Sequence, residues 1–452
     1  MLLAPWLKLF VTRLTRIYFG SRRTSKTKLV ETNSVPSRRC RALSFERLED
    51  RTLLATLTVN SLADNTTAAD GLVTLREAVM AANENIATDL GEVGEEGHDE
   101  IVFQTGLNGF IETTGSSGGG KMEVTEDLTV VGNGRENTTL LGGTSGRFFD
   151  VSGVFTNLTV RNITLRGGSP GSPEESGGAI RSLAVGANTI TVVNSTLTGN
   201  STRGNRAAGG AIYSAAGSIV ITDSTITSNA NRHSNEGSGA GGAIFAGLGS
   251  VTITNSEISN NSTGGLDAEG GAIYTVLGAV TIINSTVTGN RTTNDSGEGG
   301  AVFSNLGKVT IVNSTFSENR TTGDGAEGGA IAAFYGPIEV VNSTFHGNYT
   351  TGGSSEGGAI FSHRGAITIV NSTLSGNQTQ SDGGGIFAVY SDVTIVNSTI
   401  TGNSAAGRGG GIDFFPNAYD GESLTIHNSI VAGNSAATNP DFTIPGGPAG
   451  SL

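Results

Sequence analysis

The sequence predicts an all-β protein, a right-handed single-stranded parallel β-helix (a solenoid) with a short N-terminal amphipathic capping helix. An internal repeat, an apolar alternation of period two and a glycine-rich composition lead to this fold class. The 452 residues include 69 glycines without a Gly-X-Y period, which excludes collagen and favours tight turns between short strands. An internal repeat of this kind is typical of stacked supersecondary units.

Two motifs recur along the chain. A Gly-Gly-Ala-Ile pattern or a close variant begins at Gly177, Gly209, Gly241, Gly270, Gly299, Gly328, Gly357, Gly383 and Gly409. An Asn-Ser-Thr pattern or a close variant begins at Asn194, Asp223, Asn255, Asn284, Asn313, Asn342, Asn371, Asn397 and Asn428. The separation from the first motif to the second is 14 residues in seven of the nine repeats. The length variation therefore falls in one loop per coil, for example Ser201–Ala208, Arg291–Gly297 and Tyr349–Ser355.

Apolar residues alternate with polar ones between these motifs. Val280 and Ile282 precede Asn284 with Thr281 between them, and Val287 follows it, and the other repeats show the same pattern. Alternation of this kind indicates a strand with one buried face. With the Ile of each glycine motif, it predicts three short strands per coil. The Asn-Ser-Thr tripeptides also match the glycosylation sequon, but solenoid geometry explains their regular recurrence.

The capping helix is expected within Thr74–Asn83. Thr74 and Glu77 have the spacing of a capping box, and Leu75, Val79 and Ala82 share one helical face. An amphipathic helix here would cover the open strand edges at the end of a solenoid. The expected organisation is a leader at 1–55, the N-terminal cap and first coils at 56–165, regular repeats at 166–436 and a Pro/Gly-rich tail at 437–452.

A second asparagine follows each Asn-Ser-Thr motif by six residues in all nine repeats. This column consists of Asn200, Asn229, Asn261, Asn290, Asn319, Asn348, Asn377, Asn403 and Asn434. A side-chain amide donates and accepts, so stacked asparagines form a hydrogen-bonded ladder, and Asn also tolerates left-handed backbone geometry. We interpret the column as structural and not as a binding site.

An acidic column precedes the glycine pair in successive coils: Glu269, Glu298, Glu327, Glu356 and Asp382. Carboxylates stacked about 4.8 Å apart repel one another. The row therefore either splays outward as a solvated edge, raises its pKa values or holds a cation. A row of Ca²⁺ ions is the sharper hypothesis; no other cofactor is expected.

The charge is divided unevenly along the chain. Residues 1–55 carry a net charge of +8 and the remainder -21, and the only cysteine, Cys40, lies in the basic part. An acidic body is a poor partner for nucleic acid, and it has no disulfide or Cys-based metal site. The sequence contains no run of eighteen apolar residues, so no transmembrane helix is predicted.

Residues 41–55 read RALSFERLEDRTLLA and resemble the N-terminal sorting segment of the LEPR-XLL type, found on exported proteins of planctomycete bacteria. Leu48, Glu49, Arg51, Leu53, Leu54 and Ala55 match the motif, and Asp50 replaces its proline. This resemblance implies export. The alternative is an ordinary disordered basic tail.

The repeats at about 177–434 resemble those of the polymorphic outer-membrane protein family, whose FxxN form appears in Phe316-Ser-Glu-Asn319 and Phe345-His-Gly-Asn348. That resemblance implies a signal-bearing, secreted, adhesin-like protein at the cell outer membrane surface or outside the cell. The family's C-terminal autotransporter barrel is not expected, because only 18 residues follow Asn434. Residues 56–165 look like the N-terminal part of bacterial β-helix proteins grouped by variable C-terminal anchors.

Two function classes follow. The first is a non-enzymatic, structural or adhesive repeat protein with a surface or matrix partner that the sequence does not identify. The second is a polysaccharide-degrading β-helix enzyme, similar to a pectate lyase or a glycosidase. The sequence favours the first, because no pair of carboxylates stands out as a catalytic dyad. Asp413, Asp420 and His427 come closest to a cluster, and we interpret them as a solvated loop.

Overall fold

The computed structural model describes residues 55–113, 120–143, 146–170, 175–184, 186–204, 207–232, 239–417 and 421–443. The chain divides into two compact units, Met1–Arg51 and Thr52–Leu452, and the described residues all belong to the second. The sorting segment lies outside them except for Ala55, which begins the first strand.

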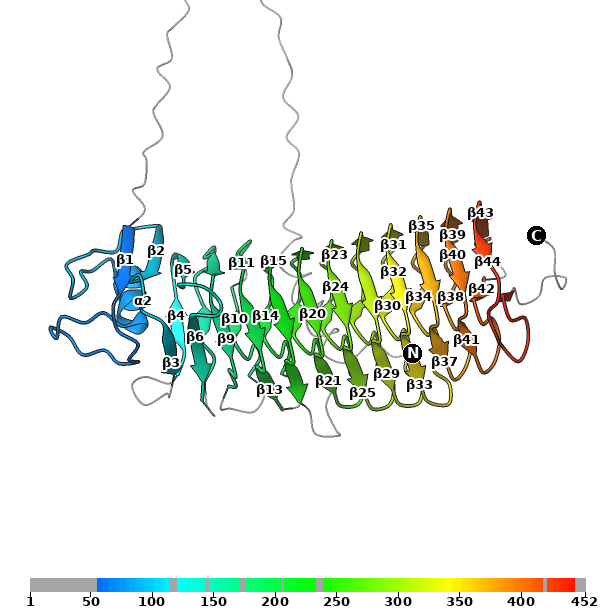
Figure 1. The fold of residues 1–452 in the computed structure, drawn as a ribbon, viewed down its shortest axis with the longest axis horizontal. Coiled ribbons are helices and arrows are strands. Elements are labelled where there is room, and N and C mark those ends of the chain that lie inside the picture. Colours follow the sequence, from blue (N-terminus) through cyan, green and yellow to red (C-terminus); the bar gives the residue numbers. More distant parts are fainter. Residues whose placement is uncertain are drawn as a thin grey trace, which may run out of the picture. The chain divides into compact units, whose positions relative to one another are not determined.

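The second unit is a right-handed parallel β-helix, which confirms the predicted fold class. Each strand pairs in parallel with its equivalent one coil earlier or later, so the sheets run along the stack of coils (Figure 1). Sheet 1 has thirteen strands: β1 (Ala55–Val59), β2 (His98–Phe103), β5 (Asp127–Val131), β8 (Leu158–Arg161), β11 (Thr189–Val193), β15 (Ser218–Thr222), β19 (Val251–Thr254), β23 (Val280–Ile283), β27 (Val309–Val312), β31 (Ile338–Val341), β35 (Ile367–Val370), β39 (Val393–Val396) and β43 (Leu424–His427).

Two twelve-stranded sheets complete the three-sided core. Sheet 2 consists of β4 (Met122–Val124), β7 (Phe149–Val151), β10 (Ile180–Ser182), β14 (Ile212–Ser214), β18 (Ile244–Ala246), β22 (Ile273–Thr275), β26 (Val302–Ser304), β30 (Ile331–Phe334), β34 (Ile360–His363), β38 (Ile386–Val389), β42 (Ile412–Phe415) and β45 (Phe442–Thr443). Sheet 3 consists of β3 (Gly109–Thr113), β6 (Thr138–Gly142), β9 (Thr164–Arg166), β12 (Thr196–Thr198), β16 (Thr225–Thr227), β20 (Glu257–Ser259), β24 (Thr286–Thr288), β28 (Thr315–Ser317), β32 (Thr344–His346), β36 (Thr373–Ser375), β40 (Thr399–Thr401) and β44 (Ile430–Val431).

A fourth sheet was not predicted from the sequence. Its eight strands lie where each variable loop was expected to begin, directly after the second asparagine: β13 (Ser201–Arg203), β17 (Ala230–Arg232), β21 (Ser262–Gly264), β25 (Arg291–Thr293), β29 (Arg320–Thr322), β33 (Tyr349–Thr351), β37 (Gln378–Thr379) and β41 (Ser404–Ala405). Their middle residues are mostly threonines, which have high strand propensity. Coils that contain these strands therefore have four strands instead of three.

The helix α2 (Leu75–Glu84) forms where the sequence predicts it. The Thr74 side chain accepts a hydrogen bond from the Glu77 backbone N–H, and the Glu77 side chain accepts one from Thr74, which completes the capping box. Leu75, Val79 and Ala82 are buried, and the helix contacts β1, β2 and β4. It therefore packs against the first coils, as expected of a cap.

The alternating apolar residues fill one continuous core. Val280, Ile282 and Val287 are fully buried, whereas Thr281 between the first two is not, and the same pattern repeats from coil to coil. Because a strand alternates its faces, each coil contributes its apolar positions to one column that continues into the next coil. This column packing makes the coils nearly interchangeable.

The turn after each strand of sheet 1 uses the left-handed region. The first asparagine of each motif has a positive φ, as in Asn284 with 51°. The asparagines of the second column do not; the residue before each of them has a positive φ instead, usually a glycine such as Gly289 with 64°. The expectation that left-handed tolerance explains the second column was therefore wrong, and its hydrogen bonds explain it instead.

Candidate functional site

The nine asparagines of the second column form a buried ladder that aligns the strands of sheet 4. From Asn200 to Asn403, each Nδ2 donates to the Oδ1 of the asparagine in the next coil at 2.8–3.0 Å, and that Oδ1 also accepts from the preceding asparagine's backbone N–H at 3.0 Å. A second hydrogen of Nδ2 reaches a backbone carbonyl, as from Asn290 to Ile258 at 2.9 Å. The amides are thus fully satisfied, and each turn into sheet 4 has the same geometry.

Asp441 takes the place of a tenth asparagine at the end of this ladder. One of its carboxylate oxygens accepts from the Nδ2 and from the backbone N–H of Asn434, both at 3.1 Å. A carboxylate accepts but does not donate when ionised, so it suits the last position of a ladder. Sequence reasoning missed it because it lies only seven residues after Asn434.

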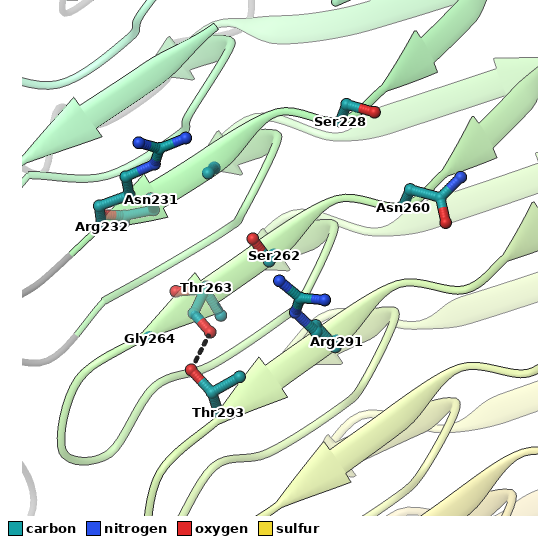
Figure 2. A pocket seen from close by; sticks show the side chains of 10 residues that line it. Ser228, Asn231, Arg232, Asn260, Ser262, Thr263, Gly264, Arg291 and Thr293 are labelled. Atoms are coloured by element: carbon teal, nitrogen blue, oxygen red, sulfur yellow. Dashed lines mark hydrogen bonds between the residues drawn. The ribbon is translucent and has the colours of Figure 1, made fainter. Parts of the chain in front are cut away.

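The outer face of sheet 4 carries a shallow groove of about 490 Å³. Figure 2 shows Arg232 from β17 and Arg291 from β25 on either side of β21, which contributes Ser262 and Thr263. The Thr293 hydroxyl donates to the Thr263 carbonyl at 3.2 Å and ties β25 to β21. The groove lies in a segment that the sequence analysis treated as loop, and the Arg-Thr-Thr alternation was the signal for it.

The groove exists because the residues of β21 are small. Ser262 stands between Ala230 and Arg291 in the pairing register, and Gly264 stands beside Thr293. A Cβ added to Gly264 would come within 2.8 Å of the Thr293 Oγ1. Long side chains occur only on the neighbouring coils, so β21 forms the floor between them.

The acidic row is stacked in register beside sheet 2. Parallel bridges join Glu269 to Glu298, Glu298 to Glu327 and Glu327 to Glu356. The four residues are only partly exposed. Burial raises the pKa of Glu269 and of Glu327 to about 8 and that of Glu356 to about 7, and burial together with the neighbouring carboxylates raises the pKa of Glu298 well above its usual range. The row is therefore more enclosed than a solvated edge.

An aromatic row lies on the outward face of sheet 2. Tyr213, Phe245, Tyr274 and Phe303 stack in successive coils with ring centroids 5.0–5.3 Å apart. Tyr274 and Phe303 are only 2% and 3% exposed, although alternation directs them away from the central core. Burial raises the pKa of Tyr274, and the neighbouring Glu269 adds to that rise, so the aromatic and acidic rows lie side by side.

In the coil where the register position of the aromatic row holds an alanine, Phe334 keeps the row continuous. Ala332 pairs with Phe303 and Phe361 in register. Phe334, two residues further along the same face, places its ring 5.6 Å from both phenylalanines. The row then continues from Phe361 to Phe387 at 5.8 Å.

The C-terminal end of the acidic row is charge-paired. Arg408 forms ion pairs with Asp382 at 3.0 Å and with the fully buried Asp413 at 3.4 Å. Burial raises the pKa of Asp413 to about 6, against the opposing effect of Arg408. The interpretation of Asp413 as part of a solvated loop was therefore wrong, because it lies inside β42.

The predicted partners of Asp413 do not join it. Asp420 lies outside the described residues, and His427 is exposed at the end of β43 in sheet 1. Within the described ranges, no group of three or more His, Cys, Asp or Glu side chains is arranged to hold a metal ion. Ca²⁺ along the acidic row stays a prediction. No helix in this part of the chain has the length and apolarity needed to cross a membrane.

Comparison with known proteins agrees with the architecture. A family model described as the right handed beta helix region matches residues 275–440. Among solved structures, the A-module of the mannuronan C-5 epimerase AlgE6 from Azotobacter vinelandii is similar over 82% of this chain and 97% of that module, with 12% identity and a TM-score of 0.32. This likeness is too weak to carry an argument about function. No curated protein sequence matches the chain. The repeats, the sheets and the family model together make this chain a right-handed parallel β-helix repeat protein.

Proposed function

We propose that this chain is an exported repeat protein of the cell outer membrane surface or the extracellular space, with a structural or adhesive role and no catalysis. The observation that carries the proposal is the outer face of sheet 4. Eight short strands in register present rows of polar side chains along the solenoid, and the loops that vary in length follow these strands. Surfaces of this kind suit contacts with an extended partner.

The leader supports export. Residues 1–55 carry a net charge of +8, against -21 for the rest, and they end in the stretch that resembles the planctomycete sorting segment. The resemblance of the repeats to polymorphic outer-membrane proteins points to the same location. The rest of the chain has no cysteine to form disulfide bonds, and this suits the role because the continuous apolar core and the asparagine ladder hold the coils together.

Location is tested by fractionation of cells that produce the tagged full-length chain. We expect the protein in the outer-membrane or medium fraction and accessible to added protease on intact cells. A matched variant with Leu53→Asp and Leu54→Asp, which alters only the sorting segment, should stay inside the cell. Wild-type protein found in the cytoplasm would contradict the proposal.

A polysaccharide-degrading enzyme is the second candidate, and the group of Glu356, Asp382, Arg408 and Asp413 favours it. Carboxyl groups with raised pKa values beside an ion-paired neighbour are typical of acid and base catalysts. Acidic and neutral polysaccharides are incubated with the protein, and released reducing or unsaturated ends are measured. The non-catalytic proposal expects none; turnover that disappears in Asp413→Asn would establish the enzyme instead.

A further inference from the structure

Four arginines lie on the outer face of sheet 4 in two register pairs. Arg203 pairs with Arg232 on β13 and β17, and Arg291 pairs with Arg320 on β25 and β29. Side chains in register on neighbouring coils are about 4.8 Å apart at the backbone. Each pair is therefore aligned along the solenoid axis, the two pairs lie in columns two residues apart across sheet 4, and the small residues of β21 stand between them.

Three of these guanidinium groups have no partner among the residues that the structure describes. Among the described residues, no hydrogen bond, ion pair or ring contact engages the exposed side chains of Arg203, Arg232 and Arg291. Arg320 contacts Tyr349, with its Nη1 3.1 Å from the hydroxyl and its guanidinium 5.9 Å from the ring centroid. In a chain with a net charge of -13, acidic side chains are plentiful, yet none of those described neutralises these three.

The groove that Arg232 and Arg291 line is rich in hydrogen-bonding groups. Ser228, Asn260, Ser262 and Thr293 offer hydroxyl and amide groups, and none of the ten lining residues is aromatic. Single-stranded nucleic acids are usually bound on aromatic stacking platforms, which this groove does not have. Guanidinium groups bind carboxylates through paired, charge-assisted hydrogen bonds, and hydroxyls and amides complement sugar hydroxyl groups.

We propose that the arginine face of sheet 4, defined by Arg203, Arg232, Arg291 and Arg320, binds an acidic polysaccharide of the polyuronate type along the solenoid axis. The inference rests on the proposed adhesive function and names the chemistry of its partner. The arginines act locally, because charges further away than about 8 Å are largely screened at physiological ionic strength. The acidic remainder of the chain therefore lowers the affinity for the polysaccharide but does not prevent binding.

The test uses the purified full chain and three probes: polygalacturonate, its fully methyl-esterified form and single-stranded poly(dT). We expect binding of polygalacturonate that weakens as NaCl is raised, and no binding of the neutral ester. The double variant Arg232→Gln with Arg291→Gln should weaken polygalacturonate binding at least about tenfold, since each of its two substitutions removes one charge-assisted contact.

A matched control keeps the change in net charge the same. Arg161 in β8 and Arg166 in β9 are exposed and have no side-chain partner among the described residues, and they lie on sheets 1 and 3. Arg161→Gln with Arg166→Gln should therefore bind as the wild type does. Thermal unfolding of both double variants checks that the fold is kept.

Three results would overturn the inference: no binding by the wild type, an equal loss in both double variants, or tighter binding of poly(dT) than of polygalacturonate. Failure here is distinguishable from failure of the proposed function. If the protein is exposed at the surface but does not bind polygalacturonate, only the proposed ligand is contradicted. If the protein binds polygalacturonate but lies in the cytoplasm, only the proposed location is contradicted.

Discussion

Tyr274 neighbours Glu269 within a single coil, and this proximity joins the aromatic row to the acidic row. Burial raises the pKa of Glu269, the Tyr274 side chain opposes that rise, and the nearby Asp267 adds to it. At the other end of the row, burial raises the pKa of Glu356, Asp382 and Asp413 add to that rise, and Arg408 opposes it. The row is thus an enclosed set of carboxyl groups, and their protonation affects the stability of the folded protein.

Stability is expected to fall as pH rises through the range in which the acidic row titrates. An unfolded glutamate titrates near pH 4.5, whereas the folded Glu269 and Glu327 titrate near 8 and Glu356 near 7. The folded state therefore binds more protons in this window, and the row's contribution to the free energy of unfolding, complete below pH 4.5, is lost towards pH 8. Denaturant unfolding at pH 5 and pH 8.5 measures the decline.

Glu298→Gln tests the row directly, because glutamine stays neutral at both pH values. We expect this variant to lose less stability between pH 5 and pH 8.5 than the wild type, by on the order of 1 kcal/mol. Glu257→Gln on the exposed face of β20 is the control and should keep the wild-type slope. Identical slopes in all three proteins would disprove the role of the row.

Asn319→Ala should be strongly destabilising. The substitution removes the Oδ1 that accepts from the Nδ2 and the backbone N–H of Asn290, and leaves both donors buried and unpaired. At roughly 1–3 kcal/mol for each unsatisfied buried group, we expect a loss of about 3 kcal/mol in chemical denaturation. Thr310→Ala, at an outward position of sheet 1, should lose much less. A ladder that contributes nothing would show equal losses for the two variants.

Phe334→Ala is expected to open a gap in the aromatic row between Phe303 and Phe361. The cost of removing a buried phenylalanine is about 3 kcal/mol, measurable as a lower midpoint of thermal unfolding. Moving the ring to the register position with the double variant Ala332→Phe and Phe334→Ala should recover much of this loss. No recovery would mean that the two positions do not share one row.

The Ca²⁺ hypothesis is tested by isothermal titration of the full chain at pH 8. Cation binding competes with protons for the same carboxylates, so affinity should fall as pH is lowered from 8 towards 6. Heat from Ca²⁺ that disappears in Glu298→Gln with Glu327→Gln supports the row as a cation site. A titration without heat at pH 8 removes the hypothesis.

Much of the fold could be predicted because solenoid columns repeat the same local rule. The alternation of Val280, Thr281 and Ile282 sets buried and outward faces without reference to distant residues, and the capping box at Thr74 and Glu77 is equally local. The six-residue offset between Asn284 and Asn290 likewise predicts a column, which the structure shows as a ladder.

The missed features depend on contacts that cross columns. The pKa of Glu298 is raised by burial and by the carboxylates of Glu327 and Glu269 in the neighbouring coils, and no spacing in the sequence reports how enclosed this side chain is. Phe334 substitutes for a neighbouring position, and Asp441 reaches Asn434 through a turn of its own length. The short strands of sheet 4 were hidden because three-residue alternation around a threonine is too brief to distinguish from a loop.

The asparagine ladder also has a direction. Every side-chain amide from Asn200 to Asn434 accepts at Oδ1 from the N-terminal side and donates one of its two N–H groups towards the C-terminal coils, so the dipoles of the C=O groups add head to tail, as peptide dipoles do in an α-helix. The positive end of this array faces Asp441, whose carboxylate supplies the opposite charge. The solenoid thus carries an internal electrical polarity, closed at its positive pole by a single acidic side chain.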